Sequence, residues 1–170
     1  ACMKNTSDQA VYDTFVLEWG LILTGSLVFF MQAGFAALCA GCVRRKNWHN
    51  TMLKNLLDAS FAALAFYCTG YALAFGDSAG ESGVTFAGNQ HFFGHDLPSY
   101  GAWFFQYACS SATVTIVAGT LAERCQVWAY MLYSLVLAGL VYPIVAHAVW
   151  STHGFLSVSA EDPLWGAGAI

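Results

Sequence analysis

Four apolar stretches, each long enough to cross a lipid bilayer as a helix, constrain this chain more than any other feature. Only 9% of the 170 residues are charged, whereas a soluble domain has about one quarter. Backbone N–H and C=O groups find no water inside a bilayer, so each stretch must pair its own groups as a helix. The sequence therefore predicts an all-α, polytopic transmembrane helix bundle with four complete spans, at about residues 20–43, 53–75, 100–121 and 127–150.

The third stretch differs in composition from a span that faces only lipid. Its polar side chains are Gln106, Ser110, Ser111, Thr113 and Thr115. Small and hydroxylated side chains let helix backbones approach closely and form hydrogen bonds where water is absent. We therefore expect the third span to lie in the interior of the bundle, surrounded by other helices.

The first and fourth stretches carry residues that predict how their helices pack and bend. Ala33, Ala37 and Gly41 recur every four residues, which places small side chains on one face and predicts a contact with another helix. Gln32 lies beside this face, and we expect its buried amide to form hydrogen bonds with a neighbouring helix. In the fourth stretch, Pro143 predicts a bend near one end.

The distribution of charge predicts the domain organisation and its sidedness. Residues 1–19 are polar and acidic and form an N-terminal segment, whereas residues 20–170 form one membrane domain whose apolar run 164–170 begins a fifth span. Five of the six Lys and Arg residues lie at the two short turns after the first and third spans. Eight of the ten Asp and Glu residues lie in the N-terminal segment and the two longer loops. The positive-inside rule then predicts that the N-terminus and both longer loops are extracellular.

Several kinds of chemistry find no support in the sequence. Five of the six Cys residues lie in or at the ends of apolar spans, where they act as small hydrophobic residues. The spacing of His91, His95, His147 and His153 does not require a metal site. The chain also lacks a nucleophile elbow, a phosphate-binding loop and a basic patch for nucleic acid. We therefore expect no enzyme activity, no catalytic residue, no metal or other cofactor and no nucleic-acid partner.

Aromatic residues gather at the expected outer ends of the third and fourth spans. With the topology above, Trp103, Phe104 and Phe105 lie at the same depth as His147 and Trp150. Rings that face lipid would form an ordinary aromatic belt at the headgroups. Rings that face inward would form a cation site, because an aromatic face attracts a small cation by roughly 0.5–2 kcal/mol. Acidic outer loops would raise the local cation concentration, so ring orientation distinguishes the two interpretations.

Several sequence blocks resemble the ammonium transporter family in its plant and algal form. They occur in the order typical of the family, with short gaps, and together cover nearly the whole chain. The blocks are MQAGFAALCAGCVRRKN (Met31 to Asn47), GYALAFGD (Gly70 to Asp77), HFFG (His91 to Gly94), FQ (Phe105 and Gln106) followed by TIVAGTLAER (Thr115 to Arg124), and YPIVAHAVW (Tyr142 to Trp150).

The resemblance implies a homotrimer in which each subunit has its own pore and about eleven helices arranged as an inverted repeat. This chain would be the N-terminal part of such a transporter, since the family's pore histidines and a characteristic aspartate fall beyond Ile170. In the family, an outer vestibule captures ammonium by cation–π contact and aromatic gates follow. Trp150 matches the vestibule tryptophan, and Phe105 matches an outer aromatic near the gate. The gate phenylalanine itself falls at Cys109, where this sequence departs from the family pattern.

The resemblance therefore predicts a multi-pass transporter of the plasma membrane that binds ammonium at Trp150, Phe105 and Cys109 and passes it inward. Its expected partners are the lipid bilayer, two further copies of itself and a cytoplasmic regulatory protein. Two alternatives stay open at this point. A sensor, or transceptor, would bind ammonium at the same vestibule and conduct it poorly, and a structural membrane subunit would only pack its spans.

Overall fold

A computed structural model describes residues 2–76, 86–121 and 123–157. All regular secondary structure in these ranges is helical, which confirms the predicted fold class. In chain order the elements are α1 (Cys2–Cys42), α2 (Trp48–Ala65), the π-helix η1 (Phe66–Gly70), α3 (Tyr71–Phe75), the 3-10 turn η2 (Phe92–Gly94), α4 (Tyr100–Leu121), α5 (Val127–Val136), the π-helix η3 (Leu137–Val141) and α6 (Tyr142–Trp150). The expected start of a fifth span, 164–170, lies outside the described residues.

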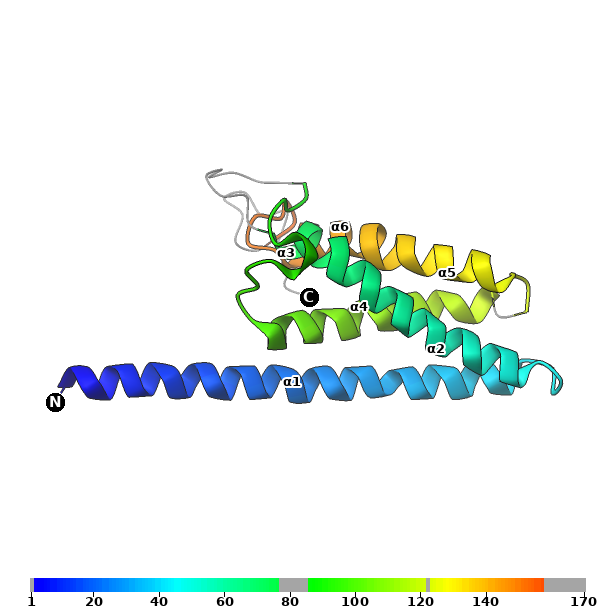
Figure 1. Ribbon diagram of the computed structural model, residues 1–170, viewed down its shortest axis with the longest axis horizontal. Coiled ribbons are helices and arrows are strands. Elements are labelled where there is room, and N and C mark those ends of the chain that lie inside the picture. The colour runs from blue at the N-terminus through cyan, green and yellow to red at the C-terminus, as the bar shows by residue number, and fades with distance from the viewer. Residues whose placement is uncertain (1, 77–85, 122, 158–170) are drawn as a thin grey trace.

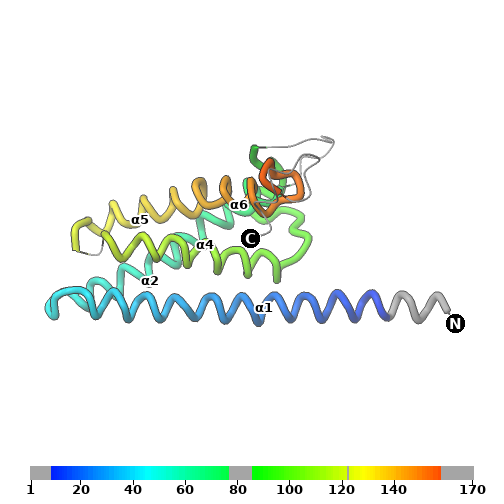
Figure 2. The backbone as a smooth tube through the Cα atoms, turned by 180° about the vertical axis from the view of Figure 1, so that it is seen from behind, coloured from blue at the N-terminus to red at the C-terminus, as the bar shows by residue number. Residues whose placement is uncertain are grey.

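The helices form a bundle with one long edge. α1 runs straight along this edge, and its first turns project past the other helices (Figure 1). α4 packs along α1, while α2 crosses the bundle and contacts α1, α4 and α5. Seen from behind, α4 lies between α1 and α5 (Figure 2). The polar side of α4 thus lies inside the bundle, as its sequence predicts, whereas Ile116 and Val117 are exposed.

Among the described residues, three continuous helical stretches are long and apolar enough to cross a membrane: Gln9–Cys42, Trp48–Phe75 and Val127–Trp150. α4 has 22 residues and so a length of about 33 Å, close to the thickness of the hydrocarbon core. α1 begins well before the expected start of the first span at residue 20. The polar segment before Gly20 contains no Pro or Gly, so nothing in it interrupts the helical backbone.

The interior of the bundle holds a polar network that joins three helices. On α4, Ser110, Ser111 and Thr115 are at most 1% exposed, whereas Thr113 points outward. The Gln32 amide of α1 donates hydrogen bonds to Ser111 Oγ at 2.9 Å and Thr115 Oγ1 at 2.6 Å. Thr115 in turn donates to Asp58 Oδ2 of α2 at 3.2 Å. The prediction that Gln32 bonds to a neighbouring helix is therefore confirmed.

Within the described residues, the small-residue face of α1 is exposed, so its contact with another helix stays a prediction. Ala33, Ala37 and Gly41 are exposed, and a Cβ added at Gly41 would meet no atom within 4 Å. α1 instead packs through the face that carries Gly25, where an added Cβ would lie 2.8 Å from the Phe104 ring of α4. Spacing shows that small residues share a face, but it does not say whether that face meets protein or lipid.

Two π-helical turns interrupt the second and fourth spans and pack against each other. η1 precedes α3, and η3 ends two residues before Pro143, so the irregularity expected near Pro143 takes the form of a π turn. The Thr69 hydroxyl of η1 lies 3.1 Å from the Gly139 carbonyl of η3 and 3.3 Å from the Ala65 carbonyl. Thr69 thereby supplies a donor near carbonyls that a regular helix would pair internally.

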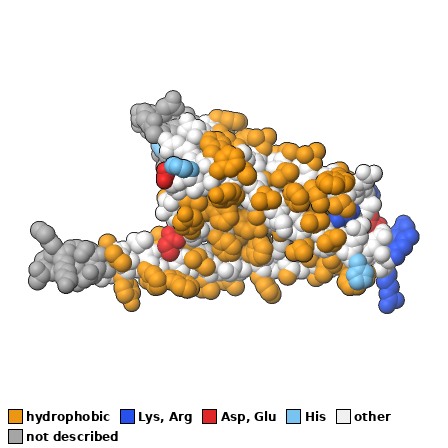
Figure 3. Space-filling view, viewed as in Figure 1, with side chains coloured by type: hydrophobic (Ala, Val, Ile, Leu, Met, Phe, Trp, Pro, Cys, Tyr) orange, Lys and Arg blue, Asp and Glu red, His pale blue; other side chains and the backbone are white. Residues whose placement is uncertain are grey.

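The two ends of the bundle differ in charge. On the face shown in Figure 3, Lys and Arg side chains gather at the end where α1 meets α2, and Asp and Glu lie mainly toward the other end. At the basic end, the Glu123 carboxylate accepts a hydrogen bond from the Arg44 backbone N–H at 3.0 Å. This bond, helped by the Asn47 amide and the charges of Arg44 and Lys46, lowers the pKa of Glu123 below its ordinary value. The carboxylate therefore ties the turn after α4 to the turn after α1.

Candidate functional site

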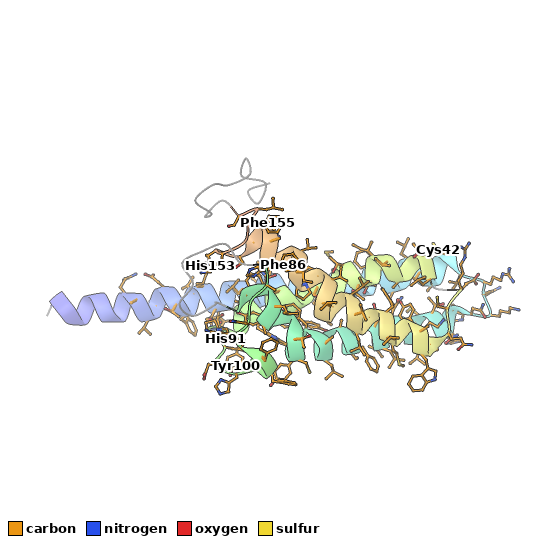
Figure 4. All side chains as sticks on the ribbon, turned by 90° about the horizontal axis from the view of Figure 1, so that it is seen from above. Cys42, Phe86, His91, Tyr100, His153 and Phe155 are labelled. Carbon is orange, nitrogen blue, oxygen red and sulfur yellow. The ribbon has the colours of Figure 1, made fainter. Side chains whose placement is uncertain are left out.

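The end of the bundle opposite the basic turns carries the aromatic residues that the sequence singles out. Figure 4 labels Cys42 at one end and Phe86, His91, Tyr100, His153 and Phe155 at the other. Since α4 begins at Tyr100 and α6 ends at Trp150, the candidate residues of both helices lie toward the second end. We call this second end the aromatic end.

An aromatic cluster fills the interior below the aromatic end. Trp103 stacks on Tyr107 with ring centroids 5.7 Å apart and an interplanar angle of 15°. Trp103 also lies 6.5 Å from the Phe66 ring, and Phe66 lies 6.2 Å from the Tyr142 ring. These rings pack on one another inside the bundle. The Trp103 ring therefore faces inward and does not belong to an aromatic belt that faces lipid.

α4 places Phe105 and Cys109 one turn apart on one face. Both side chains are half-buried, with Phe105 nearer the aromatic end. Between them along the chain, the Gln106 amide oxygen accepts a hydrogen bond from the Tyr142 hydroxyl of α6 at 3.3 Å. The structure thus joins the α4 part of the candidate site to the first turn of α6.

Trp150 is the last residue of α6 and is 61% exposed. It follows Tyr142 by eight residues, which corresponds to about 12 Å along a helix. Within the described residues, no ring contact or hydrogen bond joins Trp150 to Phe105 or Cys109. From the aromatic end inward, the order is therefore an exposed indole, a half-buried phenyl ring and a half-buried thiol. An exposed aromatic face at this end is chemically able to attract a small cation.

Comparison with known proteins identifies the family. The model of the Ammonium Transporter Family matches residues 19–162. The chain belongs to the ammonium transporter family. Ammonium transporter 1 member 3 of Solanum lycopersicum is 45% identical over 154 residues, which cover 88% of this chain and 32% of that protein. Ammonium transporter 3 of Dictyostelium discoideum is 44% identical over 131 residues, which cover 77% of this chain and 30% of that protein.

Among solved structures, a "Sensor Amt Protein" superimposes with a TM-score of 0.73 and 29% sequence identity. The match covers 85% of this chain and 35% of that protein. This ammonium transporter family member therefore spans about a third of the length of the relatives that it matches.

Two hydrogen bonds that the sequence analysis did not predict hold α6, the helix that carries Trp150. His147 is 1% exposed, and its Nδ1 lies 2.9 Å from the Ala74 carbonyl oxygen of α3. A carbonyl only accepts, so Nδ1 carries the proton and donates it. This bond fixes α6 one turn before Trp150. The Tyr142 bond to Gln106 fixes the other end of the same helix. Both bonds join residues far apart in the sequence, and no local pattern signals them.

The histidines expected near this end form local contacts. His91 Nδ1 lies 3.1 Å from the His95 carbonyl oxygen, and His95 Nδ1 lies 2.8 Å from Asp96 Oδ2. Within residues 2–76, 86–121 and 123–157, no three His, Cys, Asp or Glu side chains converge as a metal site requires.

Proposed function

We propose that this protein transports ammonium inward across the plasma membrane. In this proposal the chain is part of a complete transporter and corresponds to about a third of the length of its relatives. The observation that carries the proposal is the family match over 19–162, which includes both helices that bear the candidate site. The relatives with 44–45% identity are named ammonium transporters. No covalent step is needed, because the site only has to bind and release a small cation.

Capture begins at Trp150 in this proposal. Its exposed indole at the aromatic end offers a π face to an ammonium ion, an interaction worth roughly 0.5–2 kcal/mol. Phe105 then provides the next aromatic surface, and Cys109 lines the position of the upper gate. Residues beyond this chain carry the later step, in which the ion or its deprotonated form passes to the other side.

The proposed orientation places the aromatic end outside the cell and the basic end in the cytosol. Its support is the gathering of Lys and Arg where α1 meets α2 (Figure 3), which the positive-inside rule assigns to the cytosol. The N-terminus is then extracellular. We further propose that α4 is a membrane span, that the complete transporter is a homotrimer, and that a regulatory partner binds its cytoplasmic side.

A sensor is the second candidate function. The solved structure that superimposes with a TM-score of 0.73 is named a "Sensor Amt Protein", and in this chain Cys109 replaces the ring expected at the gate. Such a protein would bind ammonium at the same aromatic end but conduct little of it.

Uptake and binding, measured side by side, test the proposal. The complete protein is expressed in cells that lack their own ammonium transporters, and uptake of ¹⁵N-labelled ammonium is compared with that of cells carrying an empty vector. Binding to the purified protein is measured by calorimetry. We expect saturable uptake. Binding without uptake would contradict transport and support the sensor function. The absence of both binding and uptake would support a structural membrane subunit.

A further inference from the structure

A carboxylate of α1 contacts the first turn of α4 at the aromatic end. The Glu18 side chain accepts a hydrogen bond from the Gly101 backbone N–H, with Oε2 and N 3.0 Å apart. Glu18 is half-buried and Gly101 is buried, so this bond lies against the bundle. The two residues are 83 positions apart in the sequence, and the bond therefore ties two separate helices together.

Glu18 completes the cap of α4. The first N–H groups of a helix have no acceptor within the helix, so other groups must accept their hydrogen bonds. The Ser99 hydroxyl accepts from the Ala102 N–H at 3.0 Å, which is the usual role of a capping side chain. Glu18 accepts from the preceding N–H, that of Gly101. A carboxylate at this place also suits the positive end of the helix dipole.

Two glycines allow α1 and α4 to approach closely here. A Cβ added at Gly101 would lie 2.5 Å from Glu18 Oε2 and 3.1 Å from the Glu18 carbonyl oxygen. Gly25 follows about two turns further along α1, and a Cβ added there would lie 3.2 Å from the Cα atom of Phe105. α1 therefore holds the backbone of α4 at Gly101 and again at Phe105, about one turn further on.

We propose that Glu18 is a positioning residue for Phe105. By fixing the first turn of α4, the Glu18 carboxylate sets where the Phe105 ring stands at the aromatic end. The inference rests on the proposed function, in which Phe105 provides the aromatic surface that follows Trp150. A substitution at Glu18 should therefore change how tightly ammonium is held, and only as long as the Phe105 ring is present.

The concentration dependence of ammonium uptake by variants of the complete protein tests this role. Glu18→Leu removes the acceptor at a similar size. We expect it to raise the half-saturating concentration by about three- to tenfold, while saturated uptake per amount of protein in the membrane stays within about twofold. Gly101→Ala should give the same rise by an independent route, because the added Cβ displaces the carboxylate.

Two controls separate the hydrogen bond from the charge. Glu18→Gln keeps a carbonyl oxygen as the acceptor and should stay within about twofold of the wild type. Asp13→Leu removes an exposed carboxylate of the same helix, whose hydrogen bond to Gln9 lies within α1, and should leave the half-saturating concentration unchanged.

Two further measurements separate positioning from a general loss of structure. In a Phe105→Leu background, Glu18→Leu should have no further effect on the half-saturating concentration, because the ring that Glu18 positions is gone. Hydrogen exchange followed by mass spectrometry should be faster at the first turn of α4 in Glu18→Leu than in the wild type, because the Gly101 N–H has lost its acceptor.

Several results would overturn the positioning role. An unchanged half-saturating concentration in Glu18→Leu and Gly101→Ala, with saturable uptake by the wild type, would reject it and leave the proposed function intact. An equal rise in Glu18→Gln or Asp13→Leu would mean that charge alone attracts the ion. The same rise in the Phe105→Leu background, or unchanged hydrogen exchange, would mean that Glu18 does not act through that ring. If the wild type took up no ammonium, the proposed function itself would fail, and the inference with it.

Discussion

Cys109 is the residue at which this chain departs most from its family resemblance. Its thiol is half-buried one turn below Phe105 on α4. A thiol is smaller than a phenyl ring and interacts weakly with a cation. In the proposed transporter, a Cys at this position leaves the upper gate more open, unless another ring fills the space or conduction itself is altered.

Replacing Cys109 with Phe tests this interpretation. A phenyl ring would restore the side chain that the family resemblance places at the gate and offer a cation a π face worth roughly 0.5–2 kcal/mol. We therefore expect the ratio of ammonium to potassium uptake to change by about two- to thirtyfold, measured in the same cells for both ions. Cys109→Ser keeps the size of the side chain and should leave the ratio close to that of the wild type. If Cys109→Phe also keeps the wild-type ratio and rate, the position does not lie at the gate.

At the scale of the elements, the paired π turns η1 and η3 hold the second and fourth spans together. Gly70 makes the close approach possible, because an added Cβ would lie 2.6 Å from Phe66 Cδ2 and 2.9 Å from the Ala138 carbonyl oxygen. A π turn widens the helix locally, and Thr69 satisfies the Gly139 carbonyl there. The pair lies directly before α3 and α6, so it sets where the helix of Trp150 begins.

Gly70→Val should therefore destabilise the protein. The ring of Phe66 can shift, but the backbone carbonyl of Ala138 cannot shift without moving η3, and overpacking of this kind costs roughly 1–3 kcal/mol. We expect the Tm of the complete protein in detergent to fall by several degrees. Gly34→Val on α1 is the matched control, because an added Cβ at Gly34 meets no atom within 4 Å and its Tm should hardly change. Equal Tm values for the two variants would mean that the π turns do not pack this closely.

At the scale of the whole molecule, the features that could be predicted from the sequence are those that depend on local hydropathy and polarity. The helical class, the interior position of α4 and the hydrogen bonds of Gln32 all follow from one rule, that polar groups in a membrane must find partners. The contact of α1 with α4 through Gly25 was not predicted, because small residues suit both protein contacts and lipid. The bond between His147 and Ala74 also has no local signal, since its partners are 73 residues apart.

The bundle also separates two surfaces along its length. The basic end carries Arg44, Arg45 and Lys46, and the aromatic end carries Trp150. The spans between them hold the polar network of α4 and the paired π turns. The two ends can therefore be altered independently, which makes substitution at one end a control for the other.

The most direct test of the central claim is the concentration dependence of ammonium uptake in Trp150→Leu. Loss of the indole should raise the half-saturating concentration by about two- to thirtyfold, because it removes a cation–π interaction of roughly 0.5–2 kcal/mol, while the amount of protein in the membrane stays unchanged. Trp128→Leu is the matched control, because Trp128 is 80% exposed near the opposite end of the same helical stretch. An unchanged half-saturating concentration in Trp150→Leu, or an equal rise in Trp128→Leu, would contradict the role of Trp150 in capturing ammonium.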